Sequence, residues 1–234
     1  MKLLFISSSP LGDAVLTTGI LDHLLGRFPN ARVTVACGPA AASLFAACPA
    51  VEKVIVIDKT KGKRYVLDLW RATVLTRWDL IVDLRNNIVS RLVLARRRMV
   101  RSGGARRDIH KIMELAERLN LPVTAPHLWL TDSAIAKAQE WIPDGPVLAL
   151  GPTANWAGKI WAPERFAELA SRLTDPKTGI LPGATIAIFA GPGEEKLAQP
   201  VFDALEDRRT LAIIGHNDLV AVAATCISPE SLPM

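Results

Sequence analysis

Two loops in this chain carry ionisable side chains where a ligand could reach them. Each loop, Ser7–Asp13 and Gly151–Phe166, comes directly after a short apolar run and ahead of a helical stretch. The first loop ends on the carboxylate of Asp13, and the second contains the ammonium of Lys159. A carboxylate can accept a proton from an attacking hydroxyl, and an ammonium can stabilise charge that develops on a phosphate. The two loops therefore suggest a base for a hydroxyl and a cation for a phosphate.

Asp13 stands at the expected start of a helix over Asp13–Phe28. Gly12 lets the backbone approach a ligand, and a helix N-terminus favours an ionised carboxylate by about 0.3–1 kcal/mol at an exposed site. Thr17 and Thr18 follow about one turn later and either hydrogen-bond a sugar or fill the helix surface. An acid in the first turn also complements the helix dipole for purely structural reasons, so both interpretations stay open.

Lys159 lies in the second loop, ahead of a helix that is expected to begin with Pro163. An ammonium there would hold a diphosphate leaving group, and the alternative is an ordinary exposed lysine. Trp156 and Trp161 flank it. We expect Trp161 to pack under the loop, because tryptophan is usually largely buried.

A third turn, Gly191–Glu195, also follows an apolar run and opens a helical stretch. Glu194 or Glu195 would accept hydrogen bonds from ribose hydroxyls, although both residues also suit a first helical turn. The turn does not match the glycine fingerprint of dinucleotide-binding proteins, and the chain has no Walker A motif.

A cluster of basic residues between positions 91 and 111 contributes much of the net charge of +5. Its members, set against the single acid Asp108, are Arg91, Arg96, Arg97, Arg98, Arg101, Arg106, Arg107 and Lys111. Such a cluster favours an anionic partner, either a phosphate or an acidic membrane surface, or it forms a solvated basic face. Nucleic acid is disfavoured, because no aromatic residues for base stacking are interleaved with the arginines.

The spacing of apolar residues along the chain predicts the alternating strands and helices that would position these loops. Strands are expected at Leu3–Ile6, Arg32–Ala36, Val54–Ile57, Leu80–Asp83, Arg98–Arg101, Val147–Leu150, Thr185–Ala190 and Thr210–Ile214. Helices are expected over Asp13–Phe28, Ser90–Ala95, Asp108–Leu119, Ser133–Trp141, Pro163–Leu173, Glu194–Leu205 and from Leu219 onward. Repeated βα units predict an α/β fold with parallel sheets. Prolines between Pro122 and Pro146 break the rhythm, so we expect two domains, residues 1–144 and 145–234.

Composition excludes several classes of protein. No apolar stretch approaches the roughly 18 residues of a membrane span, and the first apolar run is too short for a signal peptide. Cys37, Cys48 and Cys226 suit buried thiols in a reducing compartment rather than a disulfide framework. The four histidines show no metal-ligand spacing. We therefore expect a cytoplasmic protein with no metal and no other cofactor.

Four motifs together resemble glycosyltransferase family 9, the lipopolysaccharide heptosyltransferase family. The first motif is Ser9–Asp13 followed by the pair Thr17-Thr18, and the second is Trp78–Asn87. The others are Lys159–Phe166 and Phe189–Glu195. Their order and spacing match the family over nearly the whole chain.

The resemblance implies a GT-B type fold with two Rossmann-like domains, the second incomplete. It implies an inverting, metal-independent transfer of a heptose-like sugar from an ADP-heptose-like donor to a lipopolysaccharide core or a related anionic, lipid-linked glycan. The protein would then be cytoplasmic, with peripheral contact to the inner membrane. Asp13 would be the general base. Donor contacts would come from Lys159, Thr153, Gly191, Gly193, Glu194 and Glu195. Acceptor contacts would come from Gly12, Thr17, Thr18, Arg85, Asn86, Arg97 and Arg98.

The sequence departs from the family after the helix expected from Leu219. The family has a glycine-rich loop there that binds donor phosphate, whereas this chain continues with residues 225–234, which lack it. The sequence thus resembles a C-terminally truncated member. The alternative function is a non-catalytic glycan-binding protein or an inactive remnant. A dinucleotide-dependent oxidoreductase is disfavoured by the missing fingerprint.

Overall fold

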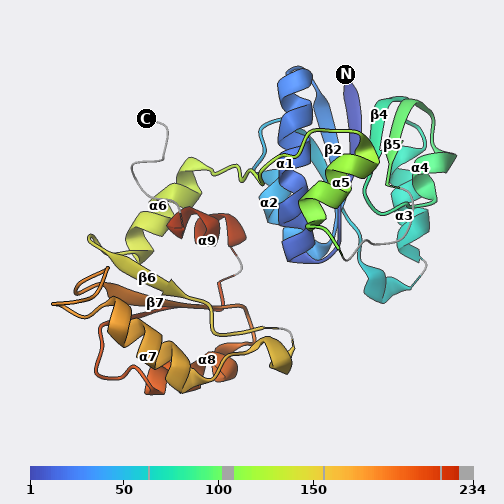
Figure 1. Cartoon of the computed structure of the whole chain (residues 1–234). Coiled ribbons are helices and arrows are strands. Elements are labelled where there is room, and N and C mark those ends of the chain that lie inside the picture. The colour runs from blue at the N-terminus through green and yellow to red at the C-terminus, as the bar shows by residue number, and fades with distance from the viewer. Residues whose placement is uncertain (63, 102–107, 155, 217, 227–234) are drawn as a thin grey trace. The chain divides into compact units, whose positions relative to one another are not determined.

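The computed structural model describes residues 1–62, 64–101, 108–154, 156–216 and 218–226. The chain folds as two compact units, Met1–Trp129 and Leu130–Met234, each built around its own parallel sheet (Figure 1). None of the helices within the described ranges is long and apolar enough to cross a membrane.

The first unit is a five-stranded parallel sheet in the order β3-β2-β1-β4-β5. Its strands are β1 (Lys2–Ile6), β2 (Arg32–Cys37), β3 (Val51–Val56), β4 (Trp78–Asp83) and β5 (Ala95–Val100). Its described helices are α1 (Leu11–Arg27), α2 (Ala42–Ala46), α3 (Arg64–Thr73), α4 (Val89–Leu92) and α5 (Lys111–Leu119).

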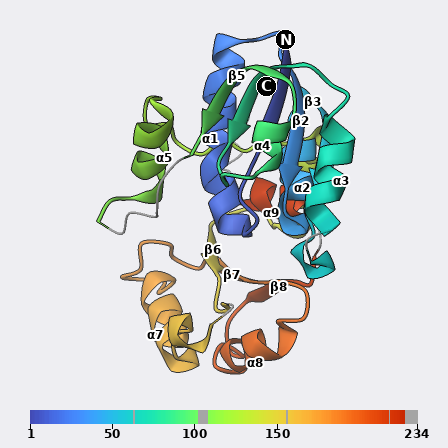
Figure 2. The ribbon, with the colours of Figure 1, turned by 90° about the vertical axis from the view of Figure 1, so that its right-hand side faces the viewer.

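The side chains of β1 explain why helices cover both faces of this sheet. Leu3 and Phe5 belong to the core beneath α1, α2 and α5, whereas Leu4 and Ile6 belong to the core beneath α3 and α4. All four are fully buried, as is typical of a central parallel strand. Figure 2 shows α1 and α5 on one side of the sheet and α3 on the other.

The fifth strand begins earlier than predicted. It was expected at Arg98–Arg101 and forms at Ala95–Val100, while the helix expected over Ser90–Ala95 ends at Leu92. β5 is an edge strand of the described sheet, and charged side chains on an edge strand block pairing with another strand. The strand therefore carries arginines instead of the apolar run that a buried strand would show.

The second unit is a three-stranded parallel sheet in the order β6-β7-β8. Its strands are β6 (Val147–Leu150), β7 (Thr185–Ala190) and β8 (Thr210–Ile214), each at its predicted position. Its described helices are α6 (Asp132–Trp141), α7 (Pro163–Leu173), α8 (Glu195–Asp203) and α9 (Leu219–Thr225). Ile186 and Ile188 of β7 pack with α7 and α8, and α6 and α9 lie on the opposite face (Figure 1).

Helix α6 belongs to the second unit, so the units divide between residues 129 and 130, ahead of the division we placed after residue 144. Contacts with the segment around α9 explain this assignment. Lys137 Nζ lies 2.7 Å from Asp218 Oδ2, and the ring of Trp141 stacks on His216 with centroids 4.2 Å apart.

The three cysteines carry free thiols. Cys37 and Cys48 are buried as expected, and burial raises the pKa of the Cys37 thiol to about 12. The expectation of a buried thiol is wrong for Cys226, which is exposed next to the end of α9.

Candidate functional site

The first candidate site forms at the carboxyl end of β1. The chain leaves β1 toward β2 and β3 on one side and returns to β4 on the other side of β1. This reversal is a topological switch point, and ligands of open α/β sheets bind outside the strand ends at such points. The loop after β1 leads straight into α1, and Asp13 lies in the first turn of that helix.

The backbone of this loop is fixed by contacts to the neighbouring strand β2. Ser7 N donates to the carbonyl oxygen of Ala36 at 2.9 Å, and its hydroxyl bonds Thr17 Oγ1 at 2.9 Å. Gly38 follows β2, and a Cβ there would lie 2.4 Å from the carbonyl oxygen of Ser9. Only glycine permits this approach, so the loops after β1 and β2 are held together.

The loop after β4 is built on a buried carboxylate. Asp83 is fully buried and accepts hydrogen bonds from the backbone N–H groups of Arg85 at 2.9 Å and Asn87 at 2.6 Å. Burial raises the pKa of Asp83, although these bonds and a bond from Ser90 oppose the rise. Asn86 between them adopts a φ of 53°, which asparagine tolerates better than most residues.

Two predicted acceptor residues, Arg85 and Asn86, lie on this loop. Arg85 Nη1 donates to Ser9 Oγ, which brings its guanidinium to the loop after β1. The carbonyl oxygen of the Asn86 side chain accepts from Arg91 Nη2 at 2.8 Å. The structure thus joins Arg85 to the loop that carries Asp13.

Asp13 itself is half-buried, and no described residue forms an ion pair with it. Its place in the first turn puts the carboxylate against the positive end of the helix dipole. Gly12 beside it is exposed, and a Cβ there would meet nothing within 4 Å. The carboxylate is therefore available to an incoming hydroxyl.

Thr17 and Thr18 were predicted to contact the acceptor, and the structure places both inside the unit. They are 0% and 1% exposed. Thr17 Oγ1 donates to the carbonyl oxygen of Ala14, and Thr18 Oγ1 accepts from the backbone N–H of His127 at 3.0 Å. Their hydroxyls fix α1 against its neighbours, which is the structural alternative that the sequence left open.

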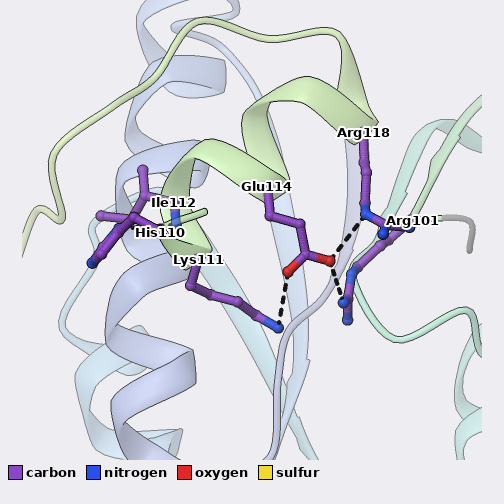
Figure 3. Close-up of polar contacts among 6 residues, drawn as sticks. All are labelled: Arg101, His110, Lys111, Ile112, Glu114 and Arg118. Carbon is purple, nitrogen blue, oxygen red and sulfur yellow. Dashed lines mark hydrogen bonds and ion pairs between the residues drawn. The ribbon is translucent and has the colours of Figure 1, made fainter. Parts of the chain in front are cut away.

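A second cationic group lies at the same end of the sheet. Arg101 directly follows β5, and its backbone N–H donates to the carbonyl oxygen of Asp83 at 2.8 Å. Its guanidinium reaches Glu114 Oε1 at 2.6 Å, as Figure 3 shows. Lys111 Nζ lies 3.5 Å from the other oxygen of Glu114, and Arg118 Nε lies 2.9 Å from Oε1.

Glu114 therefore holds three cationic side chains with one carboxylate. Its side chain is 1% exposed. Burial by itself would raise the pKa of Glu114, but the hydrogen bond and charge of Arg101 and the charges of Lys111 and Arg118 lower it. Sequence reasoning missed Glu114. The signal was its spacing of three and four residues from Lys111 and Arg118, which places all three on one helix face.

Arg97 and Arg98 do not join this group. Arg97 pairs with Leu80 in the amino-terminal half of β4, well before the strand end at Asp83. Arg98 donates from Nε to the carbonyl oxygen of Ser90 at 2.9 Å and from Nη2 to that of Val93 at 2.7 Å. These bonds secure α4 to β5. Arg106 and Arg107 lie outside the described residues.

The second candidate site forms at the carboxyl ends of β6 and β7 in the second unit. Thr153, after β6, donates from Oγ1 to Glu194 Oε2. Gly191, after β7, donates its backbone N–H to the same oxygen at 3.0 Å. The Glu194 carboxylate thus joins the two loops, and one of its oxygens is engaged by protein donors.

Glycines shape the rest of this edge. Gly193 adopts a φ of 84° and donates its backbone N–H to Glu195 Oε1 at 3.0 Å. Gly215 follows β8 with a φ of 71°, and a Cβ there would lie 3.4 Å from the same Glu195 oxygen. Backbone N–H bonds from Glu195 itself and from Gly193 lower the pKa of Glu195. The exposed Glu195 carboxylate is therefore kept ionised at the mouth of these turns.

Lys159 ends a short 3₁₀ turn, Ala157–Lys159, and is exposed. The ring of Trp156 lies over Gly158, where a Cβ would come within 2.7 Å of it. Trp161 does not pack under the loop as predicted. It is 48% exposed and makes an edge-to-face contact with Phe166 at 5.4 Å.

The Glu194 bridge yields a prediction for the second unit. Glu194→Gln removes the charged acceptor that serves Thr153 and Gly191, and hydrogen bonds to charged groups contribute about 1.5–3 kcal/mol. We expect the free energy of unfolding to fall by about 1–2 kcal/mol in urea titrations. Glu206→Gln, at an exposed position, is the control and should change it by less than about 0.5 kcal/mol. Equal stability of the two variants would contradict the bridging role.

No protein-family model matches the sequence, and no curated protein matches it. Solved structures do match. The glycosyl transferase family 9 protein from Veillonella parvula has a TM-score of 0.76 at 19% identity, over 96% of this chain and 72% of that chain. The ADP-heptose LPS heptosyltransferase II of E. coli has a TM-score of 0.68 at 20% identity, over 96% and 76% of the two chains. The E. coli heptosyltransferase WaaC with ADP has a TM-score of 0.66 at 18% identity, over 92% and 76%.

These similarities run through both parallel-sheet units and establish the architecture. The α/β prediction is confirmed, as is the prediction of a GT-B type fold with a smaller second unit. The chain has the fold of the family 9 glycosyltransferases to which its four sequence motifs point.

Proposed function

We propose that this protein is a glycosyltransferase that moves a sugar from a nucleoside-diphosphate sugar to a hydroxyl of an anionic saccharide. The observation that carries the proposal is the half-buried carboxylate of Asp13, which forms no ion pair with a described residue, at the switch point of the first sheet. The fold shared with the heptosyltransferases supports the reaction class. By that similarity the donor is an ADP-heptose-like nucleotide-sugar.

In the proposed reaction Asp13 accepts the proton of the acceptor hydroxyl. The hydroxyl oxygen forms a bond to the anomeric carbon as the bond from that carbon to the diphosphate breaks. The electron pair leaves with the nucleoside diphosphate, so direct displacement inverts the anomeric centre. Lys159 stabilises the charge that grows on the leaving group. One base and one cation suffice for this chemistry, and the proposal therefore includes no metal.

Charge on the first unit supports an anionic acceptor. Arg85, Arg101 and Lys111 lie on segments at or beyond the carboxyl ends of β4 and β5, on the side where α1 begins. A lipopolysaccharide core carries acidic groups that such residues would bind. We expect the reaction in the cytoplasm, with a lipid-linked acceptor at the inner membrane.

Incubation with a panel of nucleotide-sugars and a phosphorylated core saccharide tests the proposal. Release of nucleoside diphosphate that depends on the acceptor is the expected result. Saccharide binding with no release from any donor would favour the alternative, a non-catalytic glycan-binding protein.

Lys159→Ala provides a test of the leaving-group role. Removing one hydrogen-bond donor that stabilises negative charge in the transition state typically lowers turnover by about 10²–10³-fold. We expect a loss of about 10²-fold for this exposed residue. Lys177→Ala, another exposed lysine of the second unit, should leave turnover within about twofold of the parent chain. A Lys159→Ala protein that turns over like Lys177→Ala would remove Lys159 from the mechanism.

A further inference from the structure

A cavity of about 820 Å³ opens in the first unit at the amino ends of the strands. Its lining includes Asp79 and Leu80 from the start of β4 and Arg96 and Arg97 from the start of β5. The C-terminal ends of α1 and α5 complete it. Asp13 lies at the other end of α1. At 1.5 Å per residue, about 20 Å of helix separates the cavity from the proposed active site.

Part of the wall of this cavity is apolar. Leu24 and Phe28 line it from the end of α1, and Leu119 and Leu121 line it from the end of α5. All four belong to, or pack against, the core beneath α1 and α5. The volume lies within the 300–1,000 Å³ range typical of small-molecule sites, which are mostly apolar with a few placed polar groups.

The charged groups at this cavity are predominantly cationic. Side chains alternate along a strand, so Arg97 faces the same side of the sheet as Met99, which packs against the α1 and α5 core. Arg96 and Arg27 also line the cavity, and Arg27 lies over the ring of Phe28 at 5.9 Å.

Acidic side chains of the protein neutralise little of this positive charge. Among the described residues, no carboxylate forms an ion pair with Arg27, Arg96 or Arg97. Asp79, the acid among the described lining residues, accepts a hydrogen bond from the backbone N–H of Lys2 at 2.7 Å through Oδ2. Arg27 also complements the negative end of the α1 dipole. Arg98, which also lines the cavity, donates to the carbonyl oxygens of Ser90 and Val93. Arg96 and Arg97 remain as exposed arginines that form no ion pair with a described residue.

We propose that this cavity binds an amphiphilic anion, a phosphate headgroup carrying an alkyl chain. The headgroup contacts Arg97, Arg96 adds positive charge from the other face of this edge strand, and the chain lies along Leu24, Phe28 and Leu121. Arginines on an edge strand commonly serve only to block strand pairing, a role that needs no apolar cavity beside them. A lining that is both cationic and apolar favours a ligand that carries a negative charge and an apolar chain. The site is separate from the proposed active site and does not depend on the proposed transferase function.

Calorimetric titration of the full chain with dodecyl phosphate, kept below its micelle concentration, tests the proposal. We expect saturable binding. Inorganic phosphate lacks the chain and dodecyl maltoside lacks the charge, so each should bind at least about tenfold more weakly. Equal affinity for inorganic phosphate would overturn the apolar half of the proposal, and equal affinity for dodecyl maltoside would overturn the anionic half.

Variants locate the site. Arg97→Gln should weaken dodecyl phosphate binding by about tenfold, the scale of one lost charged hydrogen bond, and Arg97→Lys should restore part of it. Arg71→Gln, an exposed arginine on α3, is the matched control and should bind like the parent chain. Leu121→Gln tests the wall independently and should also weaken binding. Unchanged affinity in both Arg97→Gln and Leu121→Gln would place any binding elsewhere and refute the site.

Binding to lipid vesicles distinguishes a membrane lipid from a free amphiphile as the source of the ligand. Vesicles that contain phosphatidylglycerol should bind the parent chain more strongly than Arg97→Gln if the ligand is a membrane lipid. Equal binding of the two proteins to these vesicles, alongside Arg97-dependent binding of dodecyl phosphate, would assign the cavity to a free amphiphile.

Discussion

Replacing Asp13 with Asn is expected to lower transferase turnover by about 10²–10⁴-fold, the range that general base catalysis contributes. Asparagine keeps the shape of the side chain but cannot accept the proton of the acceptor hydroxyl. The residue is half-buried in the first turn of α1 and forms no ion pair with any residue that the structure describes. Substrate binding and thermal stability should therefore change little. The measurement is the steady-state rate of nucleoside diphosphate release at saturating donor and acceptor.

Asp22→Asn provides the control for this variant, since Asp22 lies on the same helix and is also half-buried. Its turnover should stay within about twofold of the parent chain. If Asp13→Asn retains parental turnover with unaltered substrate affinity, Asp13 only complements the helix dipole, and the base lies elsewhere.

Replacing Glu114 with Gln is expected to destabilise the first unit by about 3 kcal/mol, because breaking a buried ion pair leaves the charges of its partners uncompensated. Arg101, Lys111 and Arg118 would then face one another without the carboxylate that now compensates their charge. The measurement is the free energy of unfolding in urea at pH 7. Glu52→Gln is the matched contrast: its ion pair with Arg32 is exposed, and exposed pairs contribute about 0–1 kcal/mol.

The Glu114 effect depends on pH with a definite sign. Because the folded state lowers the pKa of Glu114, its stabilisation is complete above the ordinary glutamate pKa of about 4.3. It is lost as the pH falls through the lower folded value. The difference between the parent chain and Glu114→Gln should therefore shrink below about pH 4. A difference that stays constant down to pH 3, or that is absent at pH 7, would contradict the role assigned to Glu114.

The amino-acid sequence determined the framework of this protein. The strands β1, β6, β7 and β8 carry enough consecutive apolar residues that their positions follow from the sequence alone. Loops that follow such strands must lie at one edge of a parallel sheet, so Asp13 and the Gly191–Glu195 turn could be placed at ligand-binding edges without coordinates.

Elements at the margins of the sheet were less predictable. α2 has only five residues, which is too short for a periodic signal. α3 is amphipathic, but only Leu69 and Thr73 of it are buried, and it was not predicted from the sequence. β5 is an edge strand with one face toward solvent, and its arginines obscured the residue at which it begins. Thr17 and Thr18 lie on a helix face that tertiary packing makes interior, through the bond of Thr17 to Ser7 and that of Thr18 to His127.

Tertiary structure alone decided which charges act together. Arg97 and Arg101 belong to one basic run in the sequence, yet β5 carries Arg97 to a cavity at the amino end of the sheet and Arg101 to the carboxyl end. The bond between Arg85 and Ser9 joins residues far apart in the chain, because β1 and β4 are neighbours in the sheet. Sequence spacing records local periodicity, whereas strand order and register bring distant charges within a few ångströms. The sequence therefore specified the loops that could bind ligands, and the packed sheet specified which cations reach them.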